Sequence, residues 1–326
     1  MTAVMLLGDI PSTDVIREAK AERVHVTPAF NGENVPHFLD LAARGLRDRE
    51  AVVVLYPTWR PEAATRLIRF ARGILRTDRI AAVPLALPPL ALSLVADQLA
   101  FMAPHVAPGV LVSVAHRLAA GVFAGAWVNS VTKLEHVQAG IGEHVSSYLT
   151  RTGFMVSAVP WPNIHRITSA HPVAPIQFRP LDPVIVLATQ QDGDADWLQS
   201  RFQPAIGAVS MTFTAHQPLS SAYWGTRKYA EFVAFSGHQQ ALQNVIKDTQ
   251  CRRCSWCSEP TALSICPFCF MAQPQPSVAP TRQQPAAQAA APRSAPPADG
   301  SFGPAPPQGD TGPPSAGVAS PAHTSH

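Results

Sequence analysis

The stretch VVVLYPTWRPEAATRLIRFARGIL, residues 52–75, joins an apolar run to an amphipathic repeat. Residues 52–56 are consecutive apolar side chains, which is typical of a buried strand. From Pro61 onward the apolar residues return every three or four positions, and Pro61 itself suits the first turn of a helix. The apolar face of this helix consists of Ala64, Leu67, Ile68, Ala71, Ile74 and Leu75. The stretch therefore predicts one β/α unit.

The same alternation extends over the first hundred residues. Strand-like runs cover residues 3–7, 24–26 and 80–87, and residues 34–50 repeat the helical pattern. Alternation of strands and helices is typical of βαβ units around a parallel sheet. The sequence predicts an α/β fold, with a doubly wound sheet that is mainly parallel or mixed.

The pattern continues less regularly toward residue 248. It predicts strands at 110–114, 154–159, 184–188, 209–214 and 229–235, a broadly helical region at 118–149, and a short helix at 239–248. We expect one α/β globular domain over residues 1–248, with room for two subdomains and a break near 150–180.

A long uncharged stretch raises the question of a membrane span. Residues 80–96 carry no charge, but Pro84, Pro88 and Pro89 interrupt the run and Asp97 ends it short of a spanning length. A central strand followed by a buried helix explains the stretch, so no membrane partner is expected.

Composition limits the classes of partner. Hydrophobic residues make up 46% of the chain, charged residues 14%, and the formal net charge is +3. This charge is too small to indicate a nucleic-acid or membrane surface. The N-terminus lacks the basic region of a secretory signal and the cysteine count is odd, so a reducing, cytoplasmic location is expected.

All five cysteines lie between Cys251 and Cys269. Two Cys-x-x-Cys pairs, Cys254 with Cys257 and Cys266 with Cys269, have the spacing of a tetrahedral zinc site. The segment resembles the small zinc ribbons found at the ends of many bacterial and archaeal proteins, and the resemblance implies a structural Zn²⁺.

Two features of this segment depart from the ribbon pattern. Ser258 and Phe270 stand where those ribbons have glycine. Cys251 is a spare or alternative ligand, and a first pair made of Cys251 and Cys254 stays open. We expect a zinc ribbon over residues 249–272. The Pro- and Ala-rich tail, residues 273–326, is expected to be disordered, because such a composition buries too little apolar area to offset its ordering entropy.

Nucleotide-binding and hydrolase motifs are missing from the sequence, so whether the domain is catalytic is left undecided. Weak candidate site residues are Asp9 and His116, each just after an expected strand. Asp192, Asp194 and Asp196 are a third group, which could hold Mg²⁺ or Ca²⁺ or cap a helix that starts near residue 197.

The function predicted from these features is a zinc-binding interaction or regulatory protein, whose α/β domain recognises a protein partner. One alternative is an α/β hydrolase or transferase with a divalent-metal site near Asp192–Asp196. The other is a nucleic-acid-associated factor that uses the ribbon, because Arg252, Arg253 and Trp256 offer a small basic and aromatic surface.

Overall fold

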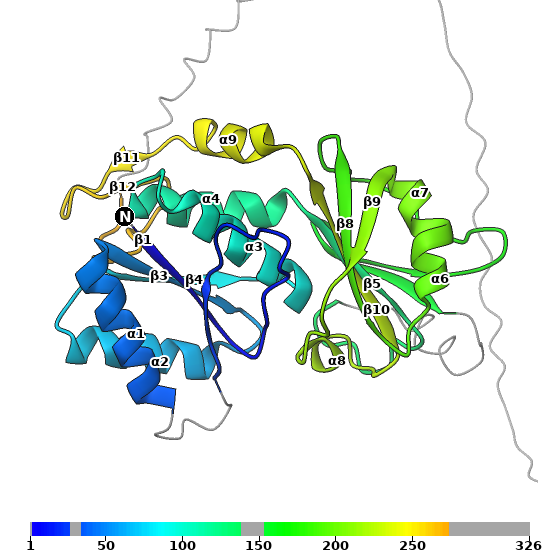
Figure 1. Cartoon of the computed structure of the whole chain (residues 1–326), viewed down its shortest axis with the longest axis horizontal. Helices are drawn as coiled ribbons and strands as arrows, with labels where there is room; N and C mark the ends of the chain where they lie inside the picture. Colours follow the sequence, from blue (N-terminus) through cyan, green and yellow to red (C-terminus); the bar gives the residue numbers. More distant parts are fainter. Residues whose placement is uncertain (1, 27–33, 138–152, 274–326) are drawn as a thin grey trace, which may run out of the picture. The chain divides into compact units, whose positions relative to one another are not determined.

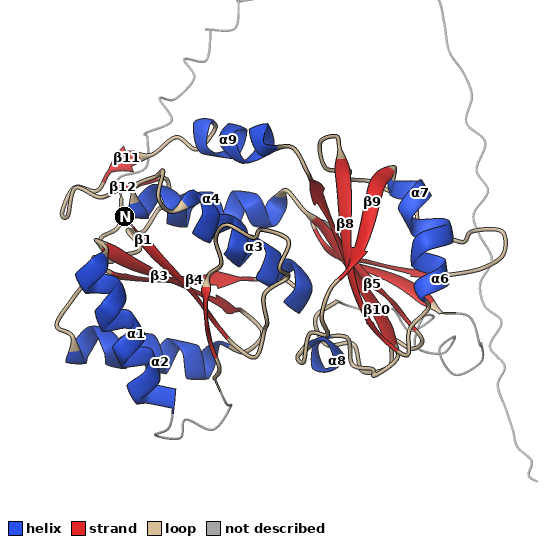
Figure 2. Ribbon diagram, in the orientation of Figure 1, coloured by secondary structure: helices blue, strands red, loops and turns tan. Residues whose placement is uncertain are grey.

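The computed structural model describes residues 2–26, 34–137 and 153–273, which form two large sheets flanked by helices and a small two-stranded sheet (Figure 1, Figure 2). The first sheet is parallel throughout, in the order β2-β1-β3-β4. Its strands are β1 (Thr2–Leu7), β2 (Glu22–Val24), β3 (Ala51–Pro57) and β4 (Ile80–Leu85). The expected β/α alternation is confirmed.

Helices cover both faces of this sheet, as the doubly wound prediction requires. Met5 and Leu7 of β1 pack toward α1 (Asn34–Asp48) and α2 (Pro61–Ile74). Val4 and Leu6, which alternate with them, pack toward α3 (Pro89–Met102) and α4 (Pro108–Ala120). Successive side chains of a strand point to opposite faces, so an uninterrupted apolar strand supplies two cores.

The second sheet is mixed, in the order β7-β6-β5-β10-β8-β9, and only β8 and β9 pair in parallel. Its strands are β5 (Phe123–Val128), β6 (Phe154–Val159), β7 (Asn163–Arg166), β8 (Val184–Gln191), β9 (Ala208–Phe213) and β10 (Tyr229–Ser236). The chain therefore passes from the first sheet to the second between β4 and β5.

Helix α3 lies between the two sheets. It packs in one core with Leu6 and Val53 of the first sheet and with Leu187 and Val233 of the second. A helix that is apolar on all sides is a buried helix, which explains the uncharged run that precedes Asp97. In the described ranges, no helix combines the length and apolar character needed to cross a membrane.

Two sequence predictions in this region are wrong. Residues 110–114 form part of α4, not a strand, and residues 123–128 of the expected helical region form β5. Short apolar runs fit a buried strand and a buried helix equally well, so periodicity alone could not separate them. The rest of that helical region, residues 138–149, lies outside the described residues.

The remaining elements are short. Residues 195–206 form α6 (Ala195–Trp197), a π-helical turn η1 (Leu198–Phe202) and α7 (Gln203–Ile206). Farther along the chain come α8 (Ser220–Tyr223), α9 (Gln239–Lys247), and the paired strands β11 (Arg252–Arg253) and β12 (Pro260–Thr261). The expected tail lies outside the described residues from 274 onward.

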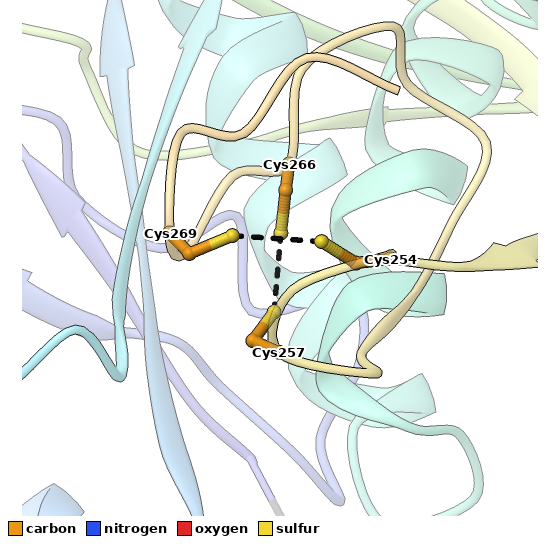
Figure 3. A group of neighbouring side chains, drawn as sticks. All are labelled: Cys254, Cys257, Cys266 and Cys269. Carbon is orange, nitrogen blue, oxygen red and sulfur yellow. Dashed lines mark hydrogen bonds between the residues drawn. The ribbon is translucent and has the colours of Figure 1, made fainter. Parts of the chain in front are cut away.

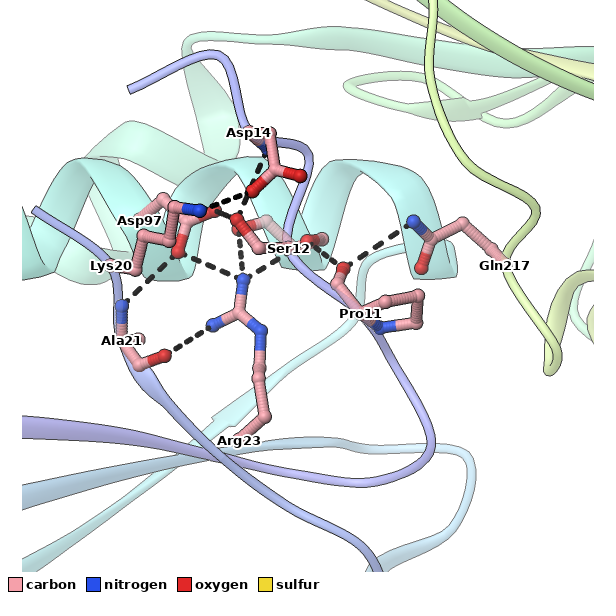
Figure 4. A network of polar contacts seen from close by, with 9 residues as sticks. Pro11, Ser12, Asp14, Lys20, Ala21, Arg23, Asp97 and Gln217 are labelled. Atoms are coloured by element: carbon pink, nitrogen blue, oxygen red, sulfur yellow. Dashed lines mark hydrogen bonds and ion pairs between the residues drawn. The ribbon is translucent and has the colours of Figure 1, made fainter. Parts of the chain in front are cut away.

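A buried carboxylate holds the β1–β2 connection against α3 (Figure 4). Asp97 accepts hydrogen bonds from Ser12 Oγ at 2.9 Å, the Ala21 backbone N–H at 3.1 Å and the Arg23 guanidinium at 2.9 Å. Ser93, one turn earlier on α3, donates to the Pro11 carbonyl at 2.6 Å. These contacts fix the chain where it leaves the carboxyl end of β1.

Candidate ligand pocket and cysteine cluster

A pocket of about 280 Å³ lies at the carboxyl ends of β1 and β3. Its lining residues are Leu7, Gly8, Val26, Pro57, Arg60, Glu62, Ala63, Ala64 and Leu219. Ligand sites of open α/β sheets gather at this edge, and the volume lies near the lower end of the roughly 300–1,000 Å³ that is usual for ligand pockets. The walls are apolar apart from Arg60 and Glu62.

The N-terminus of α2 forms the polar side of the pocket. Arg60 precedes the helix and provides no side-chain cap. The backbone N–H groups of a first helical turn lack partners within the helix and attract anions. Arg60 and Glu62 offset each other in charge, so the helix dipole leaves this side of the pocket weakly positive.

An aromatic cluster lies beside Arg60. The Arg60 guanidinium is 5.5 Å from the Trp59 ring centroid, and the Trp59 indole N–H donates to the Leu87 carbonyl at 3.0 Å. Tyr223 of α8 packs edge-on to Trp59 at 5.3 Å and stacks on His136 at 4.7 Å. Burial lowers the pKa of His136, which favours the neutral imidazole in this packing.

Asp9 lies at the same edge of the sheet as the pocket. It follows Gly8, a lining residue, and its carboxylate is 3.6 Å from Nδ1 of His25. The expectation that Asp9 follows a strand is therefore confirmed. His116, in contrast, is an exposed residue of α4, so its expected place after a strand is wrong.

Asp192, Asp194 and Asp196 follow β8 as exposed residues. Asp194 Oδ1 accepts a hydrogen bond of 2.8 Å from the Trp197 backbone N–H and caps α6. The capping interpretation of Asp194 is confirmed. These acids are not part of the metal-type cluster found within the described residues, which consists of cysteines.

Four sulfur atoms converge in the segment 251–273, which we call the cysteine module (Figure 3). The Sγ atoms of Cys254, Cys257, Cys266 and Cys269 all lie within 4.8 Å of one another. The separation is 3.5 Å between Cys254 and Cys269 and 3.6 Å between Cys257 and Cys266. Cys251 lies outside this group and beside Ser113.

Comparison with known proteins identifies the fold. Neither a family model nor a curated protein matches the chain. A DegV family protein from Corynebacterium glutamicum matches with a TM-score of 0.50 and 13% identity, over 73% of this chain and 97% of that one. A fatty-acid-binding DegV family protein from Thermus thermophilus gives 0.51 and 10%, over 72% and 99%. A stearic-acid-binding protein from Eubacterium ventriosum gives 0.51 and 10%, over 72% and 98%. The chain is similar in fold to these proteins.

These matches overturn the function predicted from the sequence. The α/β domain, to which recognition of a protein partner was assigned, has the fold of proteins that bind fatty acids. The zinc-binding interaction or regulatory protein is therefore a wrong prediction. The matches also give no support to the metal-dependent enzyme or to the nucleic-acid factor. The error arose because the cysteines carry a motif, whereas the α/β domain carries none.

Sequence reasoning missed the residues that line the pocket. Pro61 correctly marked the start of α2, and a helix that follows a parallel strand begins at the carboxyl edge of its sheet. That signal could have pointed to Arg60 and Glu62. No local signal points to Leu219, because only the fold brings it beside Gly8, with its Cδ1 atom 3.8 Å from where a Cβ on that glycine would lie.

Proposed function

We propose that the chain binds a fatty acid in the pocket at the carboxyl edge of the first sheet. The pocket, with apolar walls and one weakly positive side, carries the proposal, and the fold of the fatty-acid-binding proteins supports it. Apolar walls with a few placed polar groups are the usual form of a small-molecule site. The volume favours a single acyl chain over a lipid with two chains.

The ligand carboxylate lies at the start of α2 in this proposal. Arg60 supplies a guanidinium, and the uncapped first turn supplies backbone N–H donors. The acyl chain then contacts Leu7, Pro57 and Leu219. Both parts of the ligand are recognised, so an alcohol of the same chain length binds more weakly than the acid.

Calorimetric titration of the delipidated full chain with lauric acid and with dodecanol tests this assignment. We expect Arg60→Gln to weaken binding of the acid about tenfold, which is about 1.4 kcal/mol, and to leave binding of the alcohol unchanged. Arg69→Gln is the matched control, since it removes the same charge from the exposed side of α2. Ala63→Trp fills the pocket and weakens both ligands.

Two results contradict the proposal. One is a wild-type chain that binds neither ligand. The other is binding that is unchanged in both Arg60→Gln and Ala63→Trp, which would place the ligand elsewhere.

We also propose a structural zinc site at Cys254, Cys257, Cys266 and Cys269. Four sulfurs at about 2.3 Å from a tetrahedral Zn²⁺ lie about 3.8 Å apart, and the closest pairs here, at 3.5 and 3.6 Å, are near that value. A disulfide would bring two sulfurs to about 2.05 Å. The sulfur arrangement therefore suits a metal ion.

Elemental analysis of the full chain, purified without added metal, checks the zinc site. We expect about one zinc per chain. Cys254→Ser removes the metal, whereas Cys251→Ser, the matched control, retains it because Cys251 lies outside the cluster. Iron in place of zinc, or loss of metal in Cys251→Ser, contradicts the assignment.

A further inference from the structure

The cysteine module is continuous with the core of the first sheet. Cys254, Cys266 and Phe268 are buried among the side chains that fill the space between β3, β4, α3 and α4. Phe268 has no exposed surface. A zinc module that hangs from a flexible connection would leave these side chains in solvent.

A buried carboxylate connects the module to α4 and β4. Glu259 accepts a hydrogen bond of 2.8 Å from the Gly109 backbone N–H, in the first turn of α4. Its other oxygen accepts from the Arg79 guanidinium at 2.7 Å, just before β4. The Arg79 side chain is 32% exposed, whereas Glu259 is 8% exposed. Loss of its partners would therefore leave the Glu259 carboxylate buried without a compensating charge. Both contacts of Glu259 join the module to the α/β core.

Hydrogen bonds between side chains and backbone groups also join the module to the α/β core. Arg72 of α2 donates to the Phe268 carbonyl at 2.5 Å and to the Ile80 carbonyl at 2.6 Å, so one guanidinium spans the module and β4. Ser113 of α4 accepts a hydrogen bond of 2.9 Å from the Ala262 backbone N–H.

The fit at α4 is close enough to require a glycine. A Cβ atom on Gly109 would lie 2.1 Å from the Pro260 carbonyl oxygen and 2.8 Å from Cγ of Glu259. Gly73 of α2 provides the comparison, since a Cβ there meets no atom within 4 Å.

The module has little structure apart from its cysteines. Its two strands, β11 and β12, have two residues each. Its two Cys-x-x-Cys turns end at Ser258 and Phe270. Both residues have a φ of 61°, a conformation in which residues other than glycine are strained. The turns are closed by bonds of 3.0 Å from Ser258 N to Cys254 O and from Phe270 N to Cys266 O. Metal ligation is the interaction that can hold such turns.

We propose that zinc binding and folding of the first α/β core form one coupled equilibrium, transmitted through Glu259, Gly109, Arg72 and Arg79. This inference rests on the proposed zinc site. Coupling between two equilibria is reciprocal. Removal of zinc must therefore destabilise the core. A substitution in the α/β core that disrupts its contacts with the cysteine module must in turn weaken zinc binding.

The test uses the full chain, Zn²⁺ as the only added ligand, and substitutions at two glycines that are not zinc ligands. Zinc affinity is measured by competition with a chelator, and core stability by thermal unfolding with and without zinc. Removal of zinc should lower the melting temperature of the wild type by about 5 °C or more. Gly109→Ala should weaken zinc binding at least tenfold and reduce that shift. Gly73→Ala should change neither the zinc affinity nor the shift in melting temperature on zinc removal.

Gly109→Ala changes the stability of the chain in opposite directions, depending on whether the cysteine module docks on α4. Alanine favours a helix over glycine, so the substitution stabilises the chain if the module does not dock. It destabilises the zinc-loaded chain if the Cβ meets Pro260. Should Gly109→Ala fail to fold, Arg79→Gln removes one side of the Glu259 pair and carries the same zinc-affinity measurement.

Failure of the coupling can be distinguished from failure of the zinc site. The coupling is overturned if the wild type binds zinc but melts at the same temperature without it, and if Gly109→Ala binds zinc with unchanged affinity. That outcome leaves the zinc site intact. A wild type that binds no zinc overturns both.

Discussion

Glu231 is a fully buried carboxyl group at the centre of β10. It accepts a hydrogen bond of 2.9 Å from the Leu90 backbone N–H in the first turn of α3, and another from the Ser220 hydroxyl. Burial raises the pKa of Glu231 to about 7, and these hydrogen bonds oppose the shift only in part. One side chain of the second sheet thus binds the end of the helix shared by both sheets.

The raised pKa of Glu231 predicts a pH-dependent stability. Between the ordinary glutamate pKa and about pH 7 the folded chain holds a proton that the unfolded chain releases. This contribution to stability is fully present below the ordinary value and is lost as pH rises through 7, with a total of about 3 kcal/mol. Glu231→Gln should abolish it. Urea unfolding of the wild type and of Glu231→Gln at pH 5, 6, 7 and 8 measures the free energy of unfolding of each. Parallel pH profiles for the two chains would contradict the prediction.

At the scale of elements, α3 connects the two sheets, because it packs against both of them. It contributes buried apolar side chains to both sheets and holds the β1–β2 connection through Asp97. Burial lowers the pKa of Arg23, and Asp97 opposes that shift, so Asp97 compensates the buried guanidinium charge. The connection then fixes Gly8, which lines the pocket.

Asp97→Ala should destabilise the chain by about 3–5 kcal/mol, because it leaves the buried Arg23 charge and the Ala21 N–H without their acceptor. Lys20→Gln is the control within the same network, since it breaks the exposed Lys20–Asp14 pair and should have little effect. Equilibrium unfolding in urea compares the three chains. A loss below about 1 kcal/mol for Asp97→Ala would mean that the network does not hold the connection.

At the scale of the whole molecule, the two sheets and the cysteine module share one core around α3 and α4. The pocket lies at one end of α2, and Arg72 near the other end of α2 contacts the module. The proposed lipid site and the proposed metal site therefore both contact α2, near its opposite ends.

The sequence by itself determined the local structure of this protein. Residues 52–75 specify β3 and α2, and residues 154–159 specify β6 with the observed bounds, because periodicity and proline placement act within one element. The Cys-x-x-Cys spacing likewise marked the cysteines that come together. Only the tertiary structure decided that residues 110–114 are helical, that Leu219 reaches Gly8, and that Glu259 reaches Gly109. These outcomes depend on burial and on contacts between residues more than a hundred positions apart, for which a linear pattern holds no signal.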